Sequence, residues 1–79
     1  MSILYYNNVR LADTTAKILK ELIRLSEKPA RVVALEMGLN EDLLYVYVNG
    51  RSVPGGELLI KFADYFGVTT DYLLGRVEI

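Results

Sequence analysis

Residues 30–54 read ARVVALEMGLNEDLLYVYVNGRSVP, and they contain two short helical patterns joined by a tight turn. In the first pattern, Val33, Ala34 and Met37 recur at the spacing of one helix face. Gly38 follows at a point where a chain that leaves a helix often needs a positive φ. We therefore predict a helix that ends at Met37 and a turn that begins at Gly38.

The second pattern follows Asn40, a residue type that caps helix N-termini well. Glu41 and Asp42 suit the positive end of a helix dipole. The positions that we expect to face the core recur at i, i+3 and i+4, and they are Leu44, Tyr47 and Val48. The pattern stops at Asn49-Gly50. A helix, a glycine-containing turn and a second helix form a helix-turn-helix unit, which we assign to residues 30–50.

Residues 1–12 precede the first predicted helix and form an N-terminal arm. Their aliphatic and aromatic residues favour extended structure, and Asn7-Asn8 suits a turn. We expect an irregular arm or a short strand that packs on this domain or on a second subunit. Arg10 is the one cation of the arm, which argues against an arm that enters a DNA groove.

A helix capped by Asp13 or Thr14 follows the arm. Its apolar positions cover a broad face, and they are Ala16, Ile18, Leu19, Leu22, Ile23 and Leu25. The sequence from Ser26 to Pro29 ends this helix, because the residue before a proline disfavours the helical region. Pro29 suits the first position of the next helix, where a missing N–H costs nothing.

Two further helices are predicted in the C-terminal third. The first spans residues 57–66, and its buried stripe contains Leu58, Leu59, Phe62, Ala63 and Phe66. Gly67 ends it, Thr69 caps a short helix over residues 70–74, and Gly75 closes that helix. Val77 and Ile79 alternate in the tail, which suits a short strand or a dimer contact. Five helices joined by short loops predict one compact all-α domain over residues 1–79.

Composition narrows the possible functions. The 79 residues have an apolar content of 52%, and they contain no cysteine and no histidine. The carboxylates are scattered, and no glycine-rich loop has the spacing of a phosphate cradle, so we expect no enzyme, no cofactor and no metal. The sequence has no apolar run of membrane-helix length and no signal-peptide pattern, so we expect a cytoplasmic protein.

Charge is distributed unevenly, although the formal net charge is only −1. Residues 1–31 carry six lysines or arginines against three carboxylates. Residues 32–50 carry Glu36, Glu41 and Asp42 and no cation. Any basic binding surface should therefore lie on the first helix and near Arg51. The alternative is that the basic residues of the first helix only form a solvated face.

Taken together, these motifs resemble the lambda-repressor/Cro-like helix-turn-helix family, also called the XRE family, over about residues 18–75. The resemblance is carried by the turn at Ala34–Gly38, by the second helix ending in NGRSVP, and by LLIKFADYFGVTTDYLLG at residues 58–75. It implies a five-helix DNA-binding domain of a phage or bacterial transcriptional regulator. Such a protein binds an operator in double-stranded DNA as a dimer, as repressors of the Cro/C1 type do.

The resemblance also assigns site residues. The second helix of the unit would enter the major groove and read bases with Glu41, Asp42, Leu43, Tyr45 and Val46. Asn40 and Asn49 lie at the two ends of this helix, and Arg31 and Arg51 would hold the flanking phosphates.

A second interpretation starts from the same helix. Family members usually have polar or basic residues on its outer face, whereas this chain has two carboxylates and several apolar residues. Glu41 and Asp42 also suit a purely structural role at the helix N-terminus. Leu43, Tyr45 and Val46 form an apolar patch if they point outward, and such patches bind proteins. The alternative is an antirepressor or modulator that docks on a related repressor.

Overall fold

The structure is a computed structural model that describes residues 5–6 and 9–77. Within these residues, two short strands precede five helices. The strands are β1 (Tyr5–Tyr6) and β2 (Val9–Arg10), and the helices are α1 (Leu11–Ser26), α2 (Ala30–Met37), α3 (Glu41–Val48), α4 (Gly56–Phe66) and α5 (Thr70–Leu73). The described chain is therefore compact and mostly helical, which agrees with the all-α prediction.

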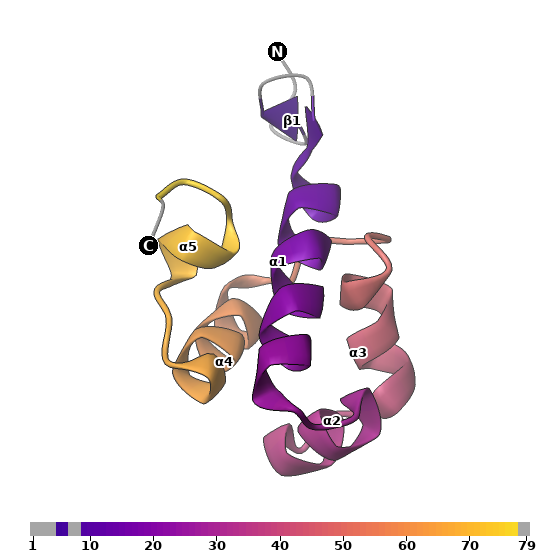
Figure 1. Cartoon of the computed structure of the whole chain (residues 1–79). Helices are drawn as coiled ribbons and strands as arrows, with labels where there is room; N and C mark the ends of the chain where they lie inside the picture. The colour runs from indigo at the N-terminus through magenta and orange to yellow at the C-terminus, as the bar shows by residue number, and fades with distance from the viewer. Residues whose placement is uncertain (1–4, 7–8, 78–79) are drawn as a thin grey trace.

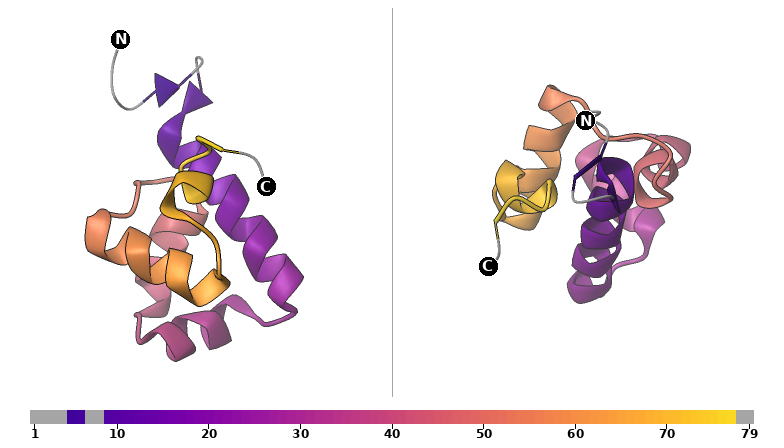
Figure 2. Two further views of the ribbon diagram at one scale, coloured as in Figure 1. Left: turned by 90° about the vertical axis from the view of Figure 1, so that its left-hand side faces the viewer. Right: turned by 90° about the horizontal axis from the view of Figure 1, so that it is seen from above.

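Helix α1 is the central element of the molecule (Figure 1). Helix α3 lies along one side of it, and α4 and α5 lie on the other side, as the view from above in Figure 2 also shows. Helix α2 packs across the C-terminal end of α1 and against α3. This arrangement leaves α3 at the outer edge of the molecule, with one side against α1 and the opposite side open.

The core lies where α1 meets the other four helices. Its largest fully buried side chains come from every helix, and they are Leu19, Val33, Leu44, Phe62 and Leu73, with Thr15 beside them. Tyr47 packs edge-on against Phe62, with ring centroids 6.0 Å apart. The half-buried position of Tyr47 agrees with its predicted place at the core.

Most of the predicted turn and cap residues are confirmed. Gly38 ends α2 with a φ of 70°, and Gly67 ends α4 with a φ of 69°. Asn40 caps α3, because its Oδ1 accepts a hydrogen bond from the Asp42 N–H at 2.7 Å. Thr69 caps α5, because its Oγ1 accepts from the Tyr72 N–H at 3.0 Å. Each of these assignments depends on residues close in sequence.

The predicted start of the first helix was wrong. Helix α1 begins at Leu11, its N-cap is Arg10, and Asp13 and Thr14 lie inside the first turn. The cause is the hairpin: β1 and β2 pair antiparallel, with Tyr5 opposite Arg10, and the chain passes from β2 directly into the helix. The arm is thus a short hairpin that ends at Arg10, two residues earlier than predicted.

Other differences concern helix ends and exposure. Pro29 is the N-cap of α2 and not its first residue, and α5 ends at Leu73. Leu25 is 61% exposed, because the apolar pattern of α1 continues further around the helix than its neighbours cover. Of the predicted stripe on α4, Phe62 and Ala63 are buried and the rest are half-buried.

The ends of the chain are described only in part. Residues 1–4, 7–8 and 78–79 lie outside the described residues, so the structure does not test the predictions made for Asn7-Asn8 and Ile79. Val77 lies in a bend, 47% exposed, and not in a strand. Within the described ranges, none of the helices combines the length and the apolar character that crossing a membrane requires.

Candidate functional site

Helices α2 and α3 form a corner, which we call the α2–α3 corner and define as residues 30–48. The turn between them is closed by backbone hydrogen bonds. The Leu39 N–H donates to the Ala34 carbonyl at 2.8 Å, and the Gly38 N–H donates to the Leu35 carbonyl at 3.1 Å. Leu39 is half-buried and packs against the core. These contacts fix the direction in which α3 leaves the turn.

Helix α3 has a buried side and an outward side. Leu44 and Val48 are buried against the core. On the outward side Leu43 is 38% exposed and Tyr45 is 40% exposed, whereas Val46 is half-buried. Glu41, Asp42 and Asn49 are exposed as well. The outward side therefore combines two carboxylates at its N-terminal end with an apolar and aromatic middle.

The predicted site residues occupy one connected region. Five of them lie on α3, Asn40 and Asn49 are its N-cap and C-cap, and Arg51 follows in the exit loop. Arg31 is exposed in the first turn of the neighbouring α2. Among the ion pairs between described residues, none involves Glu41, Asp42, Arg31 or Arg51. The charges of this region are thus exposed to solvent.

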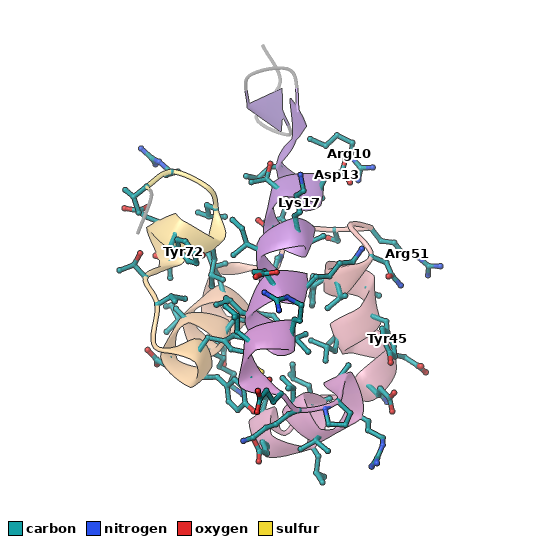
Figure 3. All side chains as sticks on the ribbon, in the orientation of Figure 1. Arg10, Asp13, Lys17, Tyr45, Arg51 and Tyr72 are labelled. Atoms are coloured by element: carbon teal, nitrogen blue, oxygen red, sulfur yellow. The ribbon has the colours of Figure 1, made fainter. Side chains whose placement is uncertain are left out.

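Sequence reasoning missed Arg10 as part of this region. Its Nη2 donates to the Gly50 carbonyl at 2.8 Å, across 40 positions of sequence. A pocket of about 290 Å³, which we call the Arg10–Arg51 pocket, is lined by Arg10, Ala12, Arg51, Ser52 and Val53. Figure 3 shows Arg10, Tyr45 and Arg51 projecting on the same side of the molecule, away from Tyr72. No local sequence pattern relates position 10 to position 50, so this pairing had no signal in the sequence.

A polar network holds α2 in place. Lys28 Nζ donates to Glu36 Oε1 at 2.8 Å, and the Tyr65 hydroxyl donates to the same oxygen. The hydrogen bond from Lys28 holds the pKa of Glu36 below its usual range, and the bond from Tyr65 adds to this effect. The hydrogen bond to Glu36 raises the pKa of Lys28 and that of Tyr65. The network joins the loop after α1, helix α2 and helix α4.

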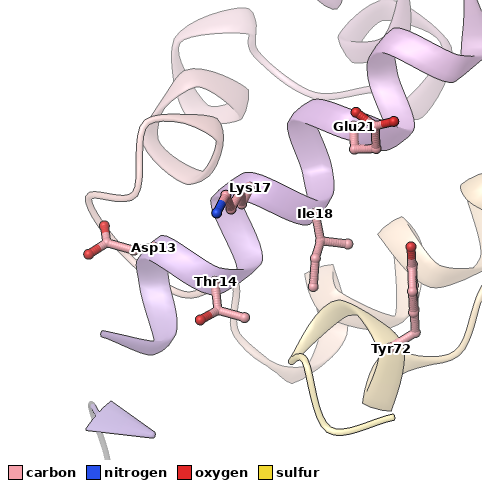
Figure 4. A pocket seen from close by; sticks show the side chains of 6 residues that line it. All are labelled: Asp13, Thr14, Lys17, Ile18, Glu21 and Tyr72. Atoms are coloured by element: carbon pink, nitrogen blue, oxygen red, sulfur yellow. The ribbon is translucent and has the colours of Figure 1, made fainter. Parts of the chain in front are cut away.

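A second concave region lies between α1 and α5, on the side away from α3 (Figure 4). It has a volume of about 630 Å³ and is lined by Asp13, Thr14, Lys17, Ile18, Glu21 and Tyr72. Its charged groups follow one another at four-residue intervals along α1, with Lys17 between two carboxylates. Within the described residues, no three His, Cys, Asp or Glu side chains come together as a metal site would require. The groove combines groups of both charges with a wall that is mainly apolar.

Comparison with protein-family models, with curated proteins and with solved structures gives no significant match to this chain, so its interpretation depends on its own geometry and on the sequence resemblance.

Proposed function

We propose that this protein is a sequence-specific DNA-binding transcriptional regulator of the repressor/Cro type, with α2 and α3 as its helix-turn-helix. The main support is the exposure of the outward side of α3 at the edge of the molecule, with Arg51 in the loop that follows it. A helix held in this way fits the width of a DNA major groove. The resemblance of residues 18–75 to this family supports the same function.

The chemistry of α3 allows a limited set of base contacts. Glu41 and Asp42 can accept hydrogen bonds from cytosine N4, and Leu43 and Val46 can contact a thymine methyl group. The Tyr45 hydroxyl can donate to a phosphate oxygen. Arginines and helix N-termini bind phosphates, which suits Arg31 in the first turn of α2. We therefore propose an operator rich in cytosine and thymine at the contacted positions.

The proposed protein acts as a dimer. In this family type, two recognition helices lie about 34–36 Å apart and meet successive major grooves on one side of the duplex. The operator would accordingly be palindromic. A selection from random duplexes at low salt, with the intact protein, tests this directly. Enrichment of a two-fold symmetric sequence supports the proposal, and failure to retain any duplex overturns it.

The carboxylates of α3 provide a second test. In the variant Glu41→Gln/Asp42→Asn we expect non-specific DNA binding at low salt to become several-fold tighter, because two charges that repel phosphates are removed. The control Glu57→Gln/Asp71→Asn removes the same charge from the first turns of α4 and α5. Fluorescence anisotropy of a labelled duplex measures the DNA affinity of both variants. Equal changes in the two variants would mean that α3 does not face DNA.

The second candidate is docking on a protein, and the exposed apolar middle of α3 favours it. Leu43 and Tyr45 are large, and each has more than a third of its surface exposed. In this alternative the partner is a related repressor, and the protein modulates it as an antirepressor. Leu43→Ser/Val46→Ser should abolish binding to that repressor, whereas Leu35→Ser on α2 should not. Survival of the complex in the α3 variant would exclude this alternative.

A further inference from the structure

We infer that Arg10 and Arg51 form an anion site that holds one phosphate group. The inference deepens the proposed function, because in that function the phosphate is a phosphodiester of the DNA backbone beside the C-terminal end of α3. It adds Arg10, at the base of the N-terminal hairpin, to the residues that contact the ligand. The same chemistry would bind free inorganic phosphate, and the experiments below separate the two sources.

The positions of both arginines are set by the C-terminal end of α3. Arg10 Nη2 donates to the Gly50 carbonyl at 2.8 Å, which fixes one corner of its guanidinium. The Arg51 N–H donates to the Val46 carbonyl at 3.0 Å, which fixes the backbone one residue further on. Two segments 40 positions apart are thereby joined at a single point. A guanidinium has five N–H donors, so most donors of Arg10 stay open to a ligand.

The pocket that the two arginines line is large enough for a phosphate. Its volume of about 290 Å³ is close to ten times the ~30 Å³ that one water molecule occupies in the liquid. Ser52 also lines it and adds a hydroxyl, while Ala12 and Val53 provide apolar walls. A phosphate and a few waters fit in this volume. A guanidinium group suits such an anion because it can bind two oxygens at once, and both arginines line this pocket.

The charges of the pocket favour an anion. Asp13 Oδ1 lies 3.9 Å from Arg10 Nη1, and both side chains are about half exposed, so this contact neutralises Arg10 weakly. Among the described residues, Arg51 has no ion-pair partner. Two cations that line one small pocket repel each other, and a bound anion removes that repulsion. The pocket also lies at the first turn of α1, whose N-cap Arg10 makes no side-chain capping bond.

The first experiment uses inorganic phosphate and the intact protein. The Nε–Hε resonances of Arg10 and Arg51 are followed by NMR during a phosphate titration, with Arg76 as an internal control. Arg76 follows α5 in the sequence, and α5 lies on the side of α1 away from α3. We expect the two pocket resonances to shift together along one saturating curve while Arg76 stays still. Equal shifts of all three arginines, or none, would overturn the anion site.

The second experiment compares variants on a duplex of mixed sequence. Arg51→Gln and Arg10→Gln should each weaken binding by about 10-fold at low salt and lower the magnitude of the salt slope by about 1. The double variant should lose less than the product of the two single losses, because both arginines hold the same phosphate. Arg76→Gln, a matched loss of one charge, should change binding little. Thermal melting checks that each variant is folded. If Arg10→Gln does not fold, Arg51→Gln still tests the site, because Arg51 is exposed and its substitution should not disturb the fold.

The outcomes separate the site from the proposed function. If the wild-type protein binds the duplex and neither Arg51→Gln nor Arg10→Gln weakens that binding, the anion site is overturned and the proposed regulatory function is retained. Saturable phosphate shifts without any duplex binding would support the site and overturn the regulator. If the pocket variants weaken duplex binding and the Arg76 variant does not, the result supports both the anion site and the proposed function.

Discussion

At the scale of single residues, two glycines let the chain approach the first turns of α1 from opposite sides. Gly50 has a φ of 73°, and a Cβ built there would lie 2.8 Å from Asp13 Oδ1. Gly75 has a φ of 74°, and its Cβ would lie 2.6 Å from Thr14 Cγ2. Both positions lie in the left-handed region, which disfavours a side chain. At position 50 the exposed Asp13 carboxylate can move away, whereas at position 75 the short Thr14 side chain gives a second penalty.

A substitution at Gly75 tests this. We expect Gly75→Ala to lower the free energy of unfolding by about 2 kcal/mol or more, since Thr14 must also shift. Gly38→Ala shares the positive φ but has open space around its Cβ, so it should cost about 1 kcal/mol. Gly56→Ala, in open space at the start of α4, should be neutral. Urea denaturation measures all three, and equal losses at positions 75 and 38 would contradict the close contact.

The Lys28–Glu36–Tyr65 network should make stability depend on pH. The pKa of Glu36 is depressed in the folded state, so its contribution is present above the unfolded pKa and is lost as pH falls through the folded value. The pKa values of Lys28 and Tyr65 are raised, so their contribution is lost on the alkaline side. We expect Glu36→Gln to lower the melting temperature slightly at neutral pH, with a difference that shrinks on acidification. A difference that grows in acid would contradict the network.

At the scale of elements, α5 is a short helix that is held on α1 by one buried hydrogen bond. The Thr15 hydroxyl donates to the Leu73 carbonyl at 2.9 Å, and Thr15 is buried. Leu73 is fully buried beside it. A helix of this length has little stability of its own, so its position depends on these contacts.

Thr15 is therefore a test of how α5 is docked. We expect Thr15→Val to cost about 1–2 kcal/mol, because it keeps the shape but leaves the Leu73 carbonyl without its donor. Thr15→Ser keeps the donor and loses a methyl group. Hydrogen exchange should show faster opening of the amides of Leu73 and Leu74 in the valine variant than in the serine variant. The reverse order would mean that packing alone holds α5.

Sequence patterns located the five helices because each pattern is local. The caps at Asn40 and Thr69 and the turn at Gly38 follow from the chemistry of neighbouring residues. The start of α1 was placed too late because the pairing of β1 with β2 decides where the helix can begin. The exposure of Leu25 was missed for a related reason: a periodic pattern does not show how far the neighbouring helices extend.

At the scale of the whole molecule, stability depends on one small core to which every helix contributes. Leu19 of α1 lies at its centre with no exposed surface, whereas Leu35 of α2 is 78% exposed. We expect Leu19→Ala to cost about 3 kcal/mol and Leu35→Ala less than about 0.5 kcal/mol. Equilibrium unfolding in urea measures both losses. Similar losses would mean that Leu35 is covered in solution, for instance by another copy of the chain.

The candidate site was partly predictable. The α3 residues were named from their order in the sequence. In the structure Glu41, Asp42, Leu43 and Tyr45 are exposed, whereas Val46 is half-buried. The contribution of Arg10 was not predictable, since it depends on a contact between the end of β2 and the end of α3. The assignment of α2 and α3 as a helix-turn-helix that binds DNA stays a proposal.

The sequence by itself determined which segments are helical, where most of them end and which side of α3 carries charge, because hydrogen bonds within a helix and its caps join residues a few positions apart. Only the tertiary structure decided that α1 lies between α3 and α5, that Leu25 is exposed and that Arg10 meets the end of α3. These features arise when segments distant in sequence bury a shared apolar surface, and a pattern along the chain does not state which surfaces will meet.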